Sequence, residues 1–127
     1  MRTIKLTHAE FLDNDDFLYI RCTKKSSVDS KNMLLDKVVG LIRNGEKNKF
    51  LFDIREPLAE MSEEDHRVCS ELLSHRASYL NSGKIAFLAN SDQPVSFLSG
   101  AYSSGFTSFI EVDNPLDASI WFSNQVT

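Results

Sequence analysis

The sequence is poor in cysteine, contains no long apolar run and shows no excess of positive charge. Cys22 and Cys69 are its two cysteines in 127 residues, too few for the disulfide framework of a small secreted domain. No stretch approaches the roughly 18 consecutive apolar residues of a membrane-spanning helix. Residues 1–6 lack the apolar segment of about 7–15 residues that a secretory signal needs. We therefore expect a cytoplasmic protein with no membrane span and with two free, mostly buried thiols.

The charge balance argues against one class of partner. Fourteen Lys and Arg residues stand against 18 Asp and Glu residues, which gives a formal net charge of −4. Nucleic-acid-binding proteins present clustered positive charge, so we expect no nucleic-acid partner. The 42% of hydrophobic residues, nine Phe among them, suffices for one real core. No repeat or linker interrupts the chain, and we expect residues 1–127 to form a single domain.

Short apolar runs alternate with helical patterns along the chain. The runs predict five strands, near residues 3–7, 17–22, 50–54, 85–89 and 109–112. We expect the first two strands to pair as an antiparallel hairpin with a long loop. Between the later strands, apolar residues recur at helical spacing. The order ββαβαβαβα predicts an α/β fold, with helices packed on a five-stranded, mixed and mostly parallel sheet.

Two predicted helices begin with recognisable capping residues. The segment Ser62–Asp65 predicts a capping box, in which the Ser hydroxyl accepts from a first-turn N–H and Asp65 reaches back. Asn114 followed by Pro115 predicts the start of the last helix. We expect Ile120 and Trp121 to hold that helix against the sheet, with Trp121 largely buried.

Two glycines lie in the predicted helical segment Ser99–Gly105. Their spacing lacks the Lys-Ser/Thr pair of a phosphate-binding loop. We expect Gly100 to permit close packing and Gly105 to end the helix. An alternative places this segment over the carboxyl edge of the sheet, where open α/β sheets bind ligands.

Three further segments are distinctive. Residues 50–54 read Phe-Leu-Phe-Asp-Ile, residues 84–88 read Lys-Ile-Ala-Phe-Leu, and residues 113–122 read Asp-Asn-Pro-Leu-Asp-Ala-Ser-Ile-Trp-Phe. In turn they resemble the hydrophobic–Asp central strand, the Lys-Ile-Ala strand and the closing helix of the SpoIIAA-like superfamily. That superfamily holds the STAS domains of sulfate transporters and anti-sigma-factor antagonists, and small STAS-like bacterial proteins of unassigned role. The resemblance covers roughly residues 17–123 and implies a SpoIIAA-like fold.

The resemblance also implies a candidate regulatory residue. In phosphorylated STAS members, a serine at the start of the helix after the Asp-bearing strand is the regulatory site. Ser62 lies nine positions after Asp53, which matches that pattern. The family site usually continues with small residues, whereas three carboxylates follow Ser62 and would repel a phosphate. A plain helix cap is therefore the favoured interpretation of Ser62, and a phosphorylation site is the alternative.

His66 and Cys69 are candidates for ligating or catalytic residues. Three residues apart on a helix, they could face one metal ion, but a zinc site needs three or four protein ligands and no second pair completes it. Cys69 falls on the predicted core face, where a thiol is inert. We therefore expect no catalytic residue, no metal site and no cofactor.

The leading functional hypothesis is a non-enzymatic STAS-like module that acts in signalling or regulation through contact with a protein partner. Its contact surface would comprise the Arg55–Ser62 loop, which includes Glu60, the start of the next helix and the Ser91–Pro94 loop. Asp53 and Arg55, which end the central strand, are candidate contacts, although a local ion pair is the simpler interpretation. The alternative is a small-molecule or lipid-binding domain with an apolar pocket between the sheet and the helices. The abundance of Phe favours that alternative.

Overall fold

A computed structural model describes residues 3–6, 9–23 and 27–124 of the chain. Within these residues the strands are β1 (Thr3–Leu6), β2 (Ala9–Asp13), β3 (Leu18–Cys22), β4 (Lys49–Asp53), β5 (Lys84–Leu88) and β6 (Phe109–Val112). The helices are α1 (Val28–Arg43), α2 (Arg55–Leu58), α3 (Glu63–His75), α4 (Ala77–Leu80), α5 (Ser96–Ser103) and α6 (Pro115–Ser123). None of these helices has the length and apolarity needed to cross a bilayer.

The strands form one mixed sheet in the order β1-β2-β3-β4-β5-β6. The pairs β1–β2 and β2–β3 are antiparallel, and the three pairs from β3 to β6 are parallel. The predicted α/β class and the mostly parallel, mixed sheet are thereby confirmed. All four parallel strands end at one edge of the sheet, which we call the carboxyl edge.

The sheet contains one strand more than the sequence analysis predicted. β2 lies between β1 and β3 and pairs with both, so the expected hairpin between the first two predicted strands is wrong. The side-chain carbonyl of Asn14 accepts from the N–H groups of Asp16 and Phe17, at 2.9 and 2.8 Å, and this turn joins β2 to β3. Thr7, which belonged to the first predicted strand, lies outside the described residues.

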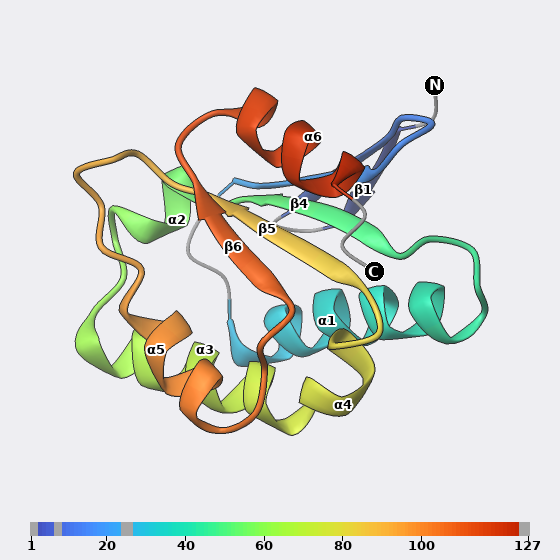
Figure 1. Cartoon of the computed structure of the whole chain (residues 1–127). Coiled ribbons are helices and arrows are strands. Elements are labelled where there is room, and N and C mark those ends of the chain that lie inside the picture. The colour runs from blue at the N-terminus through green and yellow to red at the C-terminus, as the bar shows by residue number, and fades with distance from the viewer. Residues whose placement is uncertain (1–2, 7–8, 24–26, 125–127) are drawn as a thin grey trace.

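The helices cover the two faces of the sheet unequally (Figure 1). α1, α3, α4 and α5 lie on one face, which we call the helix-layer face, and α6 lies on the other. The larger core cluster fills the helix-layer face and includes Phe50, Phe52 and Phe87 from the strands. The smaller cluster lies under α6 and includes Leu51 and Leu88. Alternate residues of β4 therefore contribute to opposite faces, as strand geometry requires.

The two glycines of the Ser99–Gly105 segment have separate roles. A Cβ on Gly100 would clash with the Ser70 hydroxyl, so glycine permits the close packing of α5 on α3 that the sequence predicted. Gly105 follows α5 with a φ of 111°, a conformation that favours glycine. The Gly105 carbonyl accepts from Asn81 Nδ2 at 2.8 Å, just before β5 begins. Gly105 thus lies at the amino edge of the sheet, so the segment ends away from the carboxyl edge over which the alternative placed it.

The last helix docks through residues other than those expected. Ala118 and Phe122 are buried, whereas Trp121 is only partly buried and Ile120 is exposed. Residues four apart share one face of a helix, so burying Ala118 and Phe122 turns Ile120 toward solvent. The ring centroids of Phe122 and Phe17 lie 5.2 Å apart. Trp121 packs beside Phe122, with ring centroids 5.6 Å apart.

Truncation of Phe122 should therefore destabilise the protein more than truncation of Trp121. We expect Phe122→Ala to lower the free energy of unfolding by about 3–5 kcal/mol, because it removes a fully buried ring. Trp121→Ala should cost less, and Ile120→Ala serves as the exposed control on the same helix. Urea unfolding of the three variants measures the order. A greater loss from Trp121→Ala than from Phe122→Ala would contradict this docking of α6.

Candidate functional site

A buried carboxylate marks the carboxyl edge of the sheet. Asp53 is 4% exposed and is the sole polar or charged side chain among the described residues that is classed as buried. It ends β4, beside Arg21 of β3 and Leu88 of β5. Because Phe52 faces the helix layer, the alternation of β4 directs Asp53 to the opposite face.

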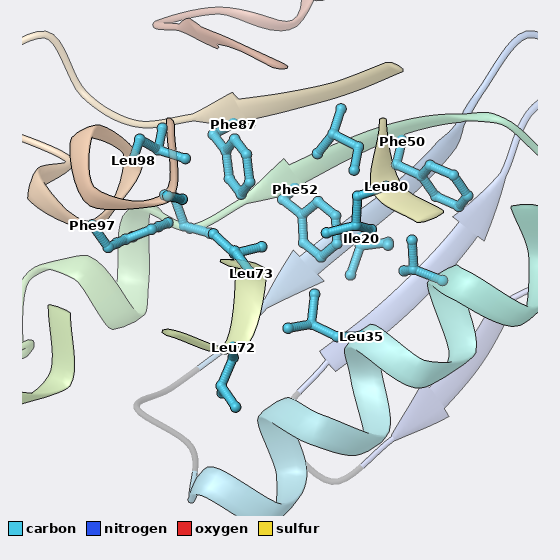
Figure 2. Packing of buried hydrophobic residues seen from close by; sticks show 14 of the residues in the cluster. Ile20, Leu35, Phe50, Phe52, Leu72, Leu73, Leu80, Phe87, Phe97 and Leu98 are labelled. Carbon is cyan, nitrogen blue, oxygen red and sulfur yellow. The ribbon is translucent and has the colours of Figure 1, made fainter. Parts of the chain in front are cut away.

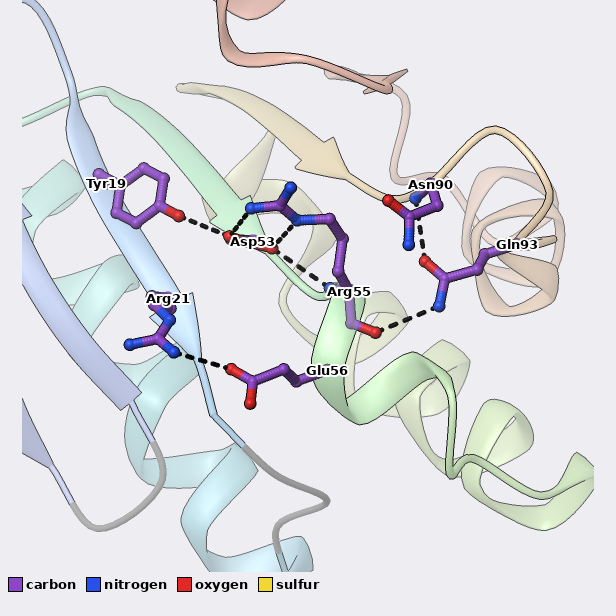
Figure 3. A network of polar contacts seen from close by, with 7 residues as sticks. All are labelled: Tyr19, Arg21, Asp53, Arg55, Glu56, Asn90 and Gln93. Carbon is purple, nitrogen blue, oxygen red and sulfur yellow. Dashed lines mark hydrogen bonds and ion pairs between the residues drawn. The ribbon is translucent and has the colours of Figure 1, made fainter.

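Three side-chain hydrogen bonds engage the Asp53 carboxylate (Figure 3). Arg55 donates from Nε to Oδ1 at 2.9 Å and from its terminal guanidinium nitrogen to Oδ2 at 2.7 Å. The Tyr19 hydroxyl donates to Oδ2 at 2.5 Å. The simpler interpretation of Asp53 and Arg55, a local ion pair, is confirmed, and it is bidentate.

The electrostatics of this group follow from burial and hydrogen bonding. Burial by itself would raise the pKa of Asp53, but the hydrogen bonds from Arg55 and Tyr19 outweigh it and hold the pKa below its ordinary value. Burial, together with the bond to Asp53, raises the pKa of Tyr19 to about 12. At neutral pH the site is therefore a fixed carboxylate held by a guanidinium and a neutral phenol.

Further polar contacts join the loops of the carboxyl edge. Arg21 on β3 donates to Glu56 on α2 at 3.2 Å. Gln93 Nε2 donates to the Arg55 carbonyl at 3.2 Å, and Gln93 Oε1 accepts from the Asn90 N–H at 2.9 Å. Figure 3 shows these contacts running from β3 through α2 to the loop after β5. These contacts therefore position α2 and the loop after β5. We call the whole network the Asp53 clamp; its members are Tyr19, Arg21, Asp53, Arg55, Glu56, Asn90 and Gln93.

The other two predicted site residues lie outside the clamp. Ser62 caps α3: its hydroxyl accepts from the Asp65 N–H at 3.1 Å, and Asp65 Oδ2 accepts from the Ser62 N–H at 2.9 Å. The predicted capping box is confirmed. Glu60 is exposed in the turn before it. The four candidate residues thus lie along one stretch of chain, but only Asp53 and Arg55 are in contact.

On the opposite face of the sheet, the helix layer leaves an apolar cavity of about 140 Å³ that is partly open to solvent. Its walls come from β2, β3, β4 and β5 of the sheet and from α1, α2, α3 and α5. They include Phe52, Phe87, Leu35, Leu72, Leu73 and Phe97. Figure 2 shows Phe52 and Phe87 pointing from the strands into the helix layer, with Leu35 and Leu73 extending toward them. We call this space the α1–α3 cavity.

Unequal helix packing leaves this space open. α3 packs extensively on α5, where Gly100 allows close approach, and makes far fewer contacts with α1. The sheet surface between α1 and α3 is therefore incompletely covered. Pro57 and Met61, from the segment between β4 and α3, line the cavity as well.

Both cysteines line the cavity and are free. Burial raises the pKa of Cys22 to about 12 and also raises the pKa of Cys69. Both residues are therefore thiols at neutral pH, and thiolate chemistry is disfavoured. The His66 ring packs on Phe97 at 5.7 Å, and the described residues contain no group of three or more His, Cys, Asp or Glu that could hold a metal ion.

The predicted site residues do not include Tyr19, Arg21 or Gln93, which lie at the carboxyl edge. Tyr19 and Arg21 alternate with the buried Ile20, so their position on the face of Asp53 follows once the register of β3 is known. Gln93 lies in the Ser91–Pro94 loop that the sequence analysis assigned to the contact surface. Its hydrogen bond to Arg55 joins residues far apart in the chain, so no local sequence pattern could predict it.

Comparisons of this chain with protein-family models, with curated proteins and with solved structures find no match. The resemblance to the SpoIIAA-like superfamily therefore stays a prediction.

The Asp53 clamp predicts an acid-dependent stability. Asp53→Asn should lower the free energy of unfolding by about 1–3 kcal/mol near neutral pH, because it removes the charge that Arg55 and Tyr19 face. A carboxyl with a lowered folded-state pKa stabilises above its unfolded pKa of about 4, and this contribution is lost as pH falls through the folded pKa. The variant should therefore lose less stability on acidification than the wild type. Urea unfolding at neutral and acidic pH measures the difference.

Asp92→Asn is the matched control for this experiment, because Asp92 is exposed in the neighbouring loop. Its stability should follow the wild type at every pH. Equal acid losses in the wild type and in Asp53→Asn would show that the clamp does not stabilise the fold.

Proposed function

We propose that this chain is a non-enzymatic regulatory module that binds a small apolar molecule in the α1–α3 cavity. The observation that supports the proposal is the cavity itself, an apolar space of about 140 Å³ lined by Phe and Leu side chains. Ligand sites in proteins are concave and mostly apolar, with few polar groups. The α1–α3 cavity has that character.

The size and lining of the cavity indicate what it can hold. An enclosed apolar cavity of about 150 Å³ binds a molecule such as benzene, and the α1–α3 cavity has a similar volume but is partly open to solvent. A ligand that enters replaces missing van der Waals contacts and removes its own apolar surface from water. An apolar body of about one aromatic ring therefore suits the α1–α3 cavity.

The second candidate function is contact with a protein partner through the carboxyl edge. Two observations favour it. The Gln93 bond to Arg55 brings together the two loops that the sequence analysis assigned to a contact surface. Pro57 and Met61, within the Arg55–Ser62 segment, also line the cavity, so a bound molecule would touch that surface from inside. The two functions are compatible, with the ligand acting on the surface that a partner contacts.

Substitution at Cys69 should test the ligand site directly. Cys69→Phe places a ring in the cavity and should abolish binding, whereas Cys69→Ala leaves the cavity open and should preserve it. A ligand that binds only the folded state raises the melting temperature. We therefore expect benzyl alcohol to raise the melting temperature of the wild type and of Cys69→Ala, but not of Cys69→Phe.

Two outcomes would contradict the ligand site. One is the absence of any melting shift in the wild type over a series of one-ring apolar molecules. The other is an equal shift in Cys69→Phe, because the ligand would then bind elsewhere. Native mass spectrometry of the freshly purified protein gives an independent measurement, in which a retained small molecule should be present in the wild type and absent from Cys69→Phe.

Ser62 distinguishes a helix cap from a phosphorylation switch. Ser62→Ala should lower the free energy of unfolding by about 0.5–2 kcal/mol, because it removes the acceptor for the Asp65 N–H. Ser62→Asp should be nearly neutral, because Asp also caps and favours the helix dipole, although neighbouring carboxylates oppose it. Thermal melts and recovery of bound proteins from lysate measure both properties. If Ser62 is only a cap, partner recovery should be equal for all three proteins. Loss of a partner with Ser62→Asp alone would instead indicate a switch.

A further inference from the structure

We propose that Arg76 limits the size of the ligand in the α1–α3 cavity, because it ties α1 to α3 and holds the space between them to about one aromatic ring. This inference rests on the proposed function and adds a determinant of ligand size to it. It follows from the hydrogen bonds of the Arg76 side chain, from their place beside the cavity and from the packing of the other helices.

The Arg76 side chain joins the end of α3 to α1. Its Nε and Nη2 atoms donate to Asp36 Oδ1 at 3.1 and 3.0 Å, and Nη2 also donates to Asn32 Oδ1 at 2.6 Å. Its Nη1 atom donates to the carbonyl of Leu72, on α3, at 3.0 Å. The guanidinium group therefore bonds to both helices at once. We call these contacts of Arg76 with Asn32, Asp36 and Leu72 the Arg76 bridge.

The Arg76 bridge is more rigid than an exposed ion pair. Two long, exposed side chains lose entropy when they are held in one geometry, so an exposed pair restrains the backbone weakly. The Arg76 side chain is only 15% exposed, although Asp36 is largely exposed. A planar guanidinium also holds its acceptors in a fixed geometry. The bridge therefore sets the separation of α1 and α3 at this point.

The Arg76 bridge lies directly beside the cavity. Asn32 precedes Met33 on α1, and Asp36 follows Leu35. Met33 and Leu35 line the cavity, as does Leu72, whose carbonyl accepts from Arg76. The bridge therefore holds the two helices at the residues that form facing walls of the cavity.

Of the two helices that the bridge joins, α1 is the one with room to move. α3 already packs closely on α5, where a Cβ on Gly100 would clash with the Ser70 hydroxyl. The end of α1 is anchored separately, because the Arg43 guanidinium lies over the Tyr79 ring of α4 at 5.1 Å. Loss of the Arg76 bridge should therefore let the cavity-lining half of α1 move away from α3 and widen the cavity.

Two alcohols that differ by one fused ring, benzyl alcohol and 2-naphthylmethanol, test the inference. In the wild type the second ring would have to spread the helices or remain in solvent. By isothermal titration calorimetry on the full chain, we expect the wild type to bind 2-naphthylmethanol no more tightly than benzyl alcohol. Arg76→Met keeps an apolar stem and loses the donors. It should bind 2-naphthylmethanol about tenfold more tightly than benzyl alcohol, because the second ring then leaves water.

Further variants assign the size limit to the Arg76 bridge. Arg67→Met is the matched control, because Arg67 also lies on α3 but pairs with glutamates of that same helix. It should keep the wild-type ratio of the two affinities. A double variant, Asn32→Ala with Asp36→Ala, removes the acceptors on α1 and should give the same ratio as Arg76→Met. Near-ultraviolet circular dichroism verifies folding, and the double variant decides the test if Arg76→Met does not fold.

The outcomes separate this inference from the proposed function. Tighter binding of 2-naphthylmethanol than of benzyl alcohol by the wild type would overturn the size limit while leaving an apolar ligand site in place. An unchanged ratio of affinities in the bridge variants, with both ligands weakened alike, would overturn the role of Arg76. Binding of neither alcohol by the wild type would count against the cavity as a ligand site, and thus against both proposals.

Discussion

The close approach of α3 to α5 determines how the helix-layer face is covered. Gly100 lets the two helices meet at a point where any side chain would clash with Ser70. α3 is consequently held near α5, and its packing on α1 is sparse. The strands beneath still present Phe52 and Phe87, which need apolar neighbours. The α1–α3 cavity is the space that this arrangement leaves, so its position is a consequence of helix packing and of one small residue.

The Asp53 clamp and the cavity share the segment between β4 and α3. The clamp fixes the beginning of that segment from the α6 side, through Arg55 and its contact with Gln93. The same segment reaches the cavity on the other face at Pro57 and Met61. Removing the donors of the buried Asp53 carboxylate would be costly, because its charge would remain without partners. The clamp therefore gives one border of the cavity a defined position.

Much of the fold could be predicted from the sequence, because its signals are local. The buried strand around Phe52, the capping box at Ser62 and the glycine at position 100 each depend on neighbouring residues, and each is confirmed. β2 was missed because it is short and contains Ala and Glu, which are weak strand formers. The burial of Trp121 was overestimated because α6 is apolar on several sides, so its pattern did not indicate which side docks.

The candidate site could be predicted only in part. Asp53 and Arg55 are two residues apart, so their ion pair was accessible to sequence reasoning, whereas the contribution of Tyr19 depends on strand pairing. The sequence did not indicate where between the sheet and the helices a pocket would lie, because its position depends on how α1 and α3 pack. Methyl NMR spectra recorded during a titration with benzyl alcohol test the proposed ligand site most directly. We predict that methyl signals of Leu35, Leu72 and Leu73 shift, while those of Leu51 and Leu88, in the cluster under α6, stay in place. Shifts confined to Leu51 and Leu88, or no shifts at all, would contradict it.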